Sequence, residues 1–188
     1  MKRIIALILA LGICFSFCAC AGITDNEYKG NGIDLAEALN SGKIPEIDIA
    51  LGTAIDAVEI SEDHSHQDDE IHGYSFVEGD KYSYFLDEKA FAYYKNAKKA
   101  NGISVVLSIS DAFGFKCNNF VSAESVKTAF GGIEFTEATV DKNDLTIMPY
   151  MLDTTKKLTY ENGGRQAVFY LMDDQLIAVA IIDTENWN

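Results

Sequence analysis

All three histidines of this chain fall within nine residues, and acidic residues surround them. They are His64, His66 and His72, and Asp68 lies between them. Imidazole nitrogens and carboxylate oxygens are ligands that zinc and other divalent first-row metals prefer. In an extended segment, His64 and His66 would point to the same side and share one ion. The pattern therefore predicts a zinc site, with Asp68 or His72 as a third ligand.

The histidine segment has a second interpretation as an ordinary solvent-exposed loop. It lies between a predicted short helix and the first long strand, where His, Asp and Glu are common, and composition of this kind is only a hint of metal binding. The corresponding segment in the second half of the chain, residues 134–144, contains acidic residues but no His. A metal site would therefore belong to the first half alone.

Other catalytic patterns are missing from the sequence. It contains no glycine-rich phosphate loop, no Gly-x-Ser-x-Gly nucleophile elbow and no zincin motif. Cys117 is expected to be a small buried hydrophobic residue. A carboxylate pair for glycoside hydrolysis stays open, because 29 acidic residues offer many pairs. We expect a protein that is not an enzyme.

The N-terminus has the pattern of a bacterial export signal. Two basic residues precede an apolar segment, residues 4–17, and small residues follow it. This segment is shorter than the about 20 residues that a membrane-spanning helix needs. Its end resembles the lipobox of bacterial lipoproteins, in which Cys20 would become the lipidated first residue, with Cys18 as the competing position. We expect residues 1–19 to be removed and an extracytoplasmic protein to remain, anchored to the bacterial cell membrane by lipid.

The charge of the chain excludes one class of partner. The sequence has 15 basic and 29 acidic residues and a net charge of −14. Residues 1–19 contain two of the basic residues and no acidic one, so the mature chain would carry −16. Such a surface repels nucleic acid and has no electrostatic attraction to an anionic membrane. We expect no nucleic-acid partner, and membrane contact through the lipid anchor only.

After a tether at residues 20–32, the sequence predicts two similar units, residues 33–120 and 121–188. Thr53 and Ser122 each precede apolar residues at helical spacing. Strand-like segments then recur at separations of 64 to 67 residues, which indicates a duplication. The matched segments are 84–87 with 150–153, 91–93 with 158–160, 103–109 with 167–173, and 112–115 with 176–179.

Local signals indicate where elements begin and end. Asp34 and Gly42 are typical of the two ends of a helix. Asn-Gly pairs at 101–102 and 162–163 favour hairpin turns, and residues 176–182 form an apolar run of strand length. The expected fold class is α+β: two tandem helix-plus-strand repeats that form a curved antiparallel sheet, with helices on one face and an open, partly aromatic face on the other.

A helix followed by antiparallel strands, twice over in an exported protein, resembles the β-lactamase-inhibitor-protein-like fold. The small outer-membrane assembly lipoproteins have one such unit. The run of residues 42–58, with Gly42, Pro45, Thr53 and Val58, is also similar to uncharacterised tandem-repeat lipoproteins of Gram-positive bacteria. The resemblance supports the expected fold and matches no known partner-binding residue.

These observations lead to two hypotheses about function. The first is a non-catalytic cell-surface lipoprotein that binds an envelope or extracellular protein partner through its sheet face. The alternative is an extracytoplasmic zinc-binding protein that uses the segment from His64 to His72.

Overall fold

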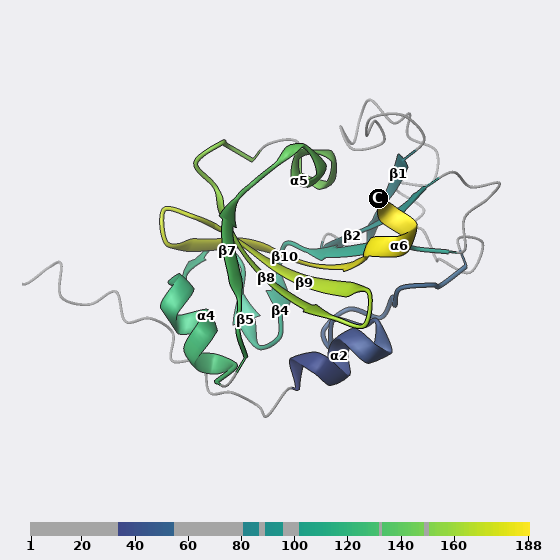
Figure 1. Ribbon diagram of the computed structural model, residues 1–188. Helices are drawn as coiled ribbons and strands as arrows, with labels where there is room; N and C mark the ends of the chain where they lie inside the picture. The colour runs from purple at the N-terminus through teal and green to yellow at the C-terminus, as the bar shows by residue number, and fades with distance from the viewer. Residues whose placement is uncertain (1–33, 55–80, 87–88, 96–101, 132, 149–150) are drawn as a thin grey trace, which may run out of the picture.

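The computed structural model describes residues 34–54, 81–86, 89–95, 102–131, 133–148 and 151–188 (Figure 1). Its helices are α2 (Leu35–Ser41), α4 (Ala123–Ala129), α5 (Lys142–Ile147) and α6 (Thr184–Trp187). Its strands are β1 (Lys81–Leu86), β2 (Ala90–Lys95), β3 (Val105–Ser108), β4 (Asp111–Ala112), β5 (Phe115–Lys116), β6 (Asn119–Phe120), β7 (Thr136–Thr139), β8 (Lys156–Asn162), β9 (Arg165–Met172) and β10 (Gln175–Asp183). None of these helices is long and apolar enough to cross a membrane.

Within these residues the strands form one antiparallel sheet in the order β1-β2-β3-β10-β9-β8-β7, and β6 pairs with the start of β10. Strands β4 and β5 form a separate hairpin. Two meanders, β1 to β3 and β7 to β10, meet where β3 pairs with β10. The predicted α+β class with an antiparallel sheet is confirmed.

The predicted helix ends at Asp34, Gly42 and Ser122 are confirmed. The carboxylate of Asp34 accepts hydrogen bonds from the first free N–H groups of α2, and Gly42 ends α2 in the left-handed conformation. Ser122 caps α4 in the same way, through Ser125 N–H. The predicted helix after Thr53 lies outside the described residues.

The hairpin turns follow their local chemistry. Gly163 and Gly164 form the two-residue turn between β8 and β9, with φ values of 58° and 78°, whereas Asn162 ends β8 and pairs with Arg165. The hairpin predicted at the Asn-Gly pair 162–163 is present, with its turn one residue further along. The turn between β9 and β10 has the same left-handed backbone at Asp173 and Asp174, with φ values of 53° and 57°. Asp tolerates this conformation better than most other non-glycine residues.

Both faces of the central sheet are covered by other elements (Figure 1). On one face, Phe169 packs in a cluster with residues of α2, α4 and the β4–β5 hairpin. On the other, Tyr170 packs with Ile147 of α5 and Trp187 of α6. The prediction of helices on one face only is therefore wrong. Residues 167–171 of β9 are all buried, so this strand needs a cover on each side.

Some of the segments matched in the sequence form strands in the structure, and others do not. Segments 91–93 and 158–160 lie in β2 and β8, while 103–109 and 167–173 overlap β3 and β9. These two pairs of strands occupy equivalent places on either side of β10. Segment 176–179 lies in β10, whereas 112–115 spans a turn in which Phe113 and Gly114 have positive φ. The prediction of a matching strand at 112–115 is therefore wrong. The prediction of a strand at 150–153 to match residues 84–86 of β1 is also wrong, because residues 151–153 are not in a strand.

Candidate functional site

The residues predicted to bind zinc or lipid lie outside the described part of the chain. These are His64, His66, Asp68, His72 and Cys20. Within the described residues, no group of three or more His, Cys, Asp or Glu side chains is placed to hold a metal ion. The zinc site and the lipid anchor stay predictions.

Cys117 is buried among apolar residues of the α2–α4 face, as predicted. Burial, followed by the nearby charges of Asp111 and Glu46, raises the pKa of this thiol to about 12. A thiol with such a pKa stays protonated at neutral pH and is a poor nucleophile.

Within the described residues, a connected group of titratable side chains lies where α5 meets strands β8 and β9. The buried carboxylate of Asp144 accepts hydrogen bonds from Lys157 Nζ at 2.6 Å and from Tyr170 Oη at 3.0 Å. Lys157 Nζ also donates to Asp141 Oδ2 at 3.3 Å. Asp141 caps α5 in a capping box with Asp144. We call these four residues the α5 network.

The environment of the α5 network keeps Tyr170, Lys157 and Asp141 in fixed protonation states at neutral pH. Burial, with the added charge of Asp144, holds the pKa of Tyr170 well above 10.0. Burial lowers the pKa of Lys157, but the hydrogen bond and charge of Asp144 raise it by more, so it lies above 10.5. Burial raises the pKa of Asp141, and the N–H groups of Asp144 and Asn143 more than offset this effect. Tyr170, Lys157 and Asp141 therefore do not titrate near pH 7, and the network attaches α5 to the sheet.

The predicted open aromatic face is covered in the described residues. Tyr93 and Tyr170 are 1% and 0% exposed, and Tyr93 Oη donates a hydrogen bond to the carbonyl oxygen of Ile147. Tyr93 also packs edge-on against Trp187, with ring centroids 5.9 Å apart. These tyrosines are core residues that hold α5 and α6 on the sheet, so they offer no surface to a partner.

Strand β7 is the most exposed part of the described sheet. All four of its residues are exposed, and β8 is its one neighbour among the described strands. The carboxylate of Glu137 pairs with Lys127 at 3.0 Å and with Lys156 at 3.8 Å. The hydrogen bond and charge of Lys127 lower the pKa of Glu137. The sequence predicts a loop over residues 134–144, whereas β7 and the start of α5 lie there. The residues of β7, TEAT, include no large apolar side chain that would mark a strand.

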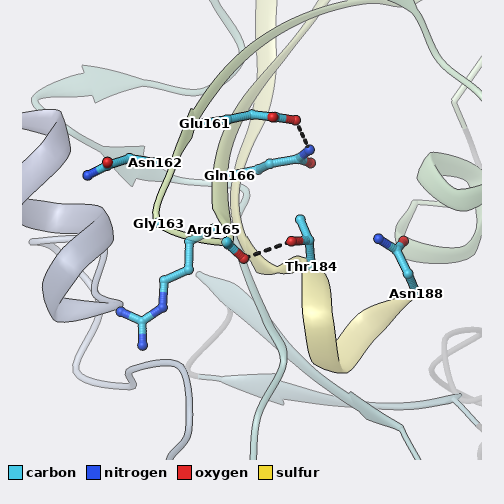
Figure 2. A pocket seen from close by; sticks show the side chains of 8 residues that line it. Glu161, Asn162, Gly163, Arg165, Gln166, Thr184 and Asn188 are labelled. Atoms are coloured by element: carbon cyan, nitrogen blue, oxygen red, sulfur yellow. Dashed lines mark hydrogen bonds between the residues drawn. The ribbon is translucent and has the colours of Figure 1, made fainter.

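A polar hollow of about 390 Å³ lies beside the β8–β9 turn (Figure 2). Its walls come from the turn 162–165, the flanking Glu161 and Gln166, and Thr184 and Asn188 at the C-terminus. Gln166 Nε2 donates to Glu161 Oε1, and Thr184 Oγ1 donates to the carbonyl oxygen of Gly164 at 2.7 Å. Sequence reasoning found the turn but not the hollow, because the C-terminal residues meet the turn only in the folded chain.

Comparison with known proteins gives one similar solved structure to report. No model of a protein family matches the chain, and no curated protein matches it. A DUF4309 family protein (YjgB) from Bacillus subtilis subsp. subtilis str. 168 is similar with a TM-score of 0.43 and 13% sequence identity. The match covers 79% of this chain and 92% of that chain. Similarity at this level is too low to assign a family or a function to this chain.

Proposed function

We propose that this protein is a non-catalytic lipoprotein of the cell surface that binds a protein partner of the envelope along strand β7. The observation that carries the proposal is the full exposure of β7 at the edge of the described sheet. The central strands, by contrast, are buried on both faces. The edge therefore replaces the sheet face as the proposed binding surface.

An exposed edge strand has a defined chemical preference. Its outward N–H and C=O groups can pair with an extended segment of another chain, which then joins the sheet. Charged side chains on an edge usually oppose such pairing. On β7 the charge of Glu137 is paired with Lys127 and Lys156, which lessens this opposition. We expect the partner to contribute a short extended segment with small or polar side chains.

Site-specific photocrosslinking in living cells tests this surface. A photoreactive amino acid replaces Ala138 in β7 or, as a control, Thr128 on α4, which is also exposed. We expect a discrete covalent adduct from position 138 and none from position 128. An equal adduct from both positions, or an adduct from 128 alone, would exclude β7 as the binding surface.

The proposed lipid anchor and duplication have their own support. The export pattern and Cys20 support the anchor.

The strand order supports the duplication. Strands β3 and β9 lie on either side of β10, and β2 and β8 are the next strands outward. Matched residues also face opposite sides: Phe91 lies in the α5–α6 cluster and Leu158 in the α2–α4 cluster. A two-fold relation along β10 would produce this reversal, because such a rotation exchanges the faces of the sheet.

Zinc binding is the second candidate, and the three histidines within nine residues favour it. Calorimetric titration of zinc into the metal-free protein without its export segment is the test. We expect one saturable site of micromolar affinity or better, lost when His64, His66 and His72 are all replaced by Ala. Weak heat that the triple variant shares would leave this segment as an ordinary loop.

A further inference from the structure

The hollow beside the β8–β9 turn is separate from β7 and has a size suited to a small ligand. Its volume of about 390 Å³ falls in the lower part of the range of about 300–1,000 Å³ that small-molecule sites occupy. A single sugar ring or an amino acid fits within this volume. No residue of β7 contributes to its walls.

Hydrogen bonds hold the walls of the hollow in place. The N–H and the hydroxyl of Thr184 both donate to the carbonyl oxygen of Gly164, at 3.1 and 2.7 Å, and so join the C-terminal segment to the turn. Arg165 Nη1 donates to the carbonyl oxygens of Leu39 and Asn40, at 2.7 and 2.8 Å, which fixes the turn to the end of α2. A wall that is already ordered loses less conformational entropy on binding.

The chemistry of the walls favours a ligand with several hydroxyl groups. The hollow is lined by glycine and polar residues alone. The side chains of Glu161 and Gln166 lie together on one wall, and the side chain of Asn188 stands across from them (Figure 2). The carboxylate accepts hydrogen bonds, whereas each amide group both donates and accepts. Adjacent hydroxyl groups of a sugar, which also donate and accept, match this combination.

The charges around the hollow disfavour an anion. Glu161 lines it, and the side chain of Glu185 lies beside Gly164. The guanidinium of Arg165 extends away from the hollow to the end of α2 (Figure 2). The ammonium of Lys95 is not part of the wall, and its Nζ already donates to the backbone oxygen of Asn188 at 2.8 Å. A carboxylate or phosphate ligand would therefore meet a carboxylate on the wall, with the guanidinium directed elsewhere.

We infer that this hollow binds one neutral, hydroxyl-rich sugar unit through Glu161, Gln166 and Asn188. The inference is independent of strand addition at β7. Without an aromatic side chain in the wall for a sugar ring to stack on, the expected affinity for a single unit is about millimolar.

Two-dimensional NMR with isotope-labelled protein tests the inference, with N-acetylglucosamine as the neutral probe and glucuronate as the anionic one. We expect saturable shifts of the Gly163 and Gly164 amide signals with N-acetylglucosamine and much weaker shifts with glucuronate. The Gln166→Ala variant should bind about tenfold more weakly, because a hydrogen-bonding side chain is lost. The control Gln175→Ala, at the far end of β10, should bind like the unaltered protein.

Several results would overturn the inference. One is the absence of a saturable shift at about 50 mM probe, well above the expected millimolar constant. Others are equal affinity in Gln166→Ala and in the unaltered protein, or tighter binding of glucuronate. The spectra of both variants report directly whether each is folded, so a misfolded Gln166→Ala would be recognised, and Gln166→Glu would then replace it as the test. In that variant affinity should again fall, because two adjacent carboxylates repel each other.

Discussion

Asp144 is the residue on which the attachment of α5 depends. The residue is 4% exposed, and its carboxylate accepts hydrogen bonds from Lys157 and Tyr170, which lie 13 and 26 residues further along the chain. Burial of a charge is tolerated when a partner of opposite charge and additional hydrogen bonds surround it. Strands β8 and β9 therefore supply the opposite charge and the hydrogen-bond donors that the buried carboxylate of Asp144 needs, and these bonds fix α5 to the sheet.

Replacing Asp144 with Ala should destabilise the protein by about 3 kcal/mol, because Lys157 would lose its buried partner and Tyr170 its acceptor. Chemical denaturation measures this loss. The exposed Asp153 offers a matched control, and Asp153→Ala should change stability by less than about 0.5 kcal/mol. The double variant Asp144→Ala/Lys157→Ala should lose less free energy of unfolding than the two single variants lose in sum. Strict additivity would mean that the pair contributes no coupling.

Alanine substitutions at Gly52 and Gly102 distinguish the cost of backbone strain from the cost of steric overlap. Both have positive φ, 81° and 98°. A Cβ at Gly52 would meet nothing within 4 Å, whereas a Cβ at Gly102 would lie 2.5 Å from the carbonyl oxygen of Gly52. We expect Gly52→Ala to cost about 1 kcal/mol and Gly102→Ala about 3 kcal/mol in the free energy of unfolding. Equal losses in thermal denaturation would contradict the close approach of the two segments.

Helices α5 and α6 cover a sheet face that consists of large side chains. Ile147 of α5 and Trp187 of α6 are each 1% exposed and pack with Tyr93 and Tyr170. Both helices are short, at six and four residues, so their own backbone hydrogen bonds provide little stability. Packing and the α5 network therefore hold them in place.

The α5 network predicts a loss of stability at high pH. The pKa of Tyr170 and that of Lys157 are raised in the folded protein, so the folded state keeps two protons that the unfolded chain releases. Their stabilising contributions are complete below about pH 10 and decrease as the pH rises further. Denaturation curves between pH 7 and 11 should show a falling free energy of unfolding above pH 10.

Tyr170→Phe provides the control for this pH dependence. The variant lacks the phenol, so its stability should fall less steeply above pH 10 than that of the unaltered protein. The same slope in both proteins would show that the alkaline loss arises elsewhere.

At the scale of the whole molecule, the two predicted units share one sheet and both core clusters. Strand β10 of the second unit pairs with β3 of the first over four residue pairs. Residues of both units are present in each hydrophobic cluster. Neither unit has a core of its own in the described structure, so they should unfold together.

A fragment of residues 121–188 should therefore fail to fold alone. It retains β7 to β10 but loses α2, β3 and the β4–β5 hairpin, which leaves apolar side chains of β9 and β10 uncovered. We expect the circular dichroism of the fragment to lack a cooperative thermal transition, while the chain from residue 21 shows a single one. A cooperative transition in the fragment would identify an independent domain.

Lipid attachment can be tested on the complete precursor. Cys20→Ala should abolish labelling of the protein by a radioactive fatty acid and release it from the membrane fraction, because the thiol that would carry the lipid is lost. Cys18→Ala should leave both properties unchanged. The opposite pattern would place the processing site two residues earlier.

Local signals were sufficient to predict several elements. Asp34, Gly42 and Ser122 act on atoms within a few residues, and Gly163 and Gly164 form the β8–β9 turn through their own φ angles. The apolar run at 176–182 became β10 because its length fits a buried strand. The candidate surfaces had no such signal, since β7 has no apolar pattern and the hollow joins segments about twenty residues apart.

The sequence by itself determined the start and end of α2, the start of α4, the β8–β9 hairpin and the α+β class, because these depend on neighbouring residues and on the alternation of apolar side chains. Only the tertiary structure decided that both faces of the sheet are covered. Tyr93 and Tyr170 have the same chemistry on an open face as in a core, and their burial depends on Ile147 and Trp187 packing over them. Long-range packing therefore decided where the protein surface lies and which residues a ligand can reach.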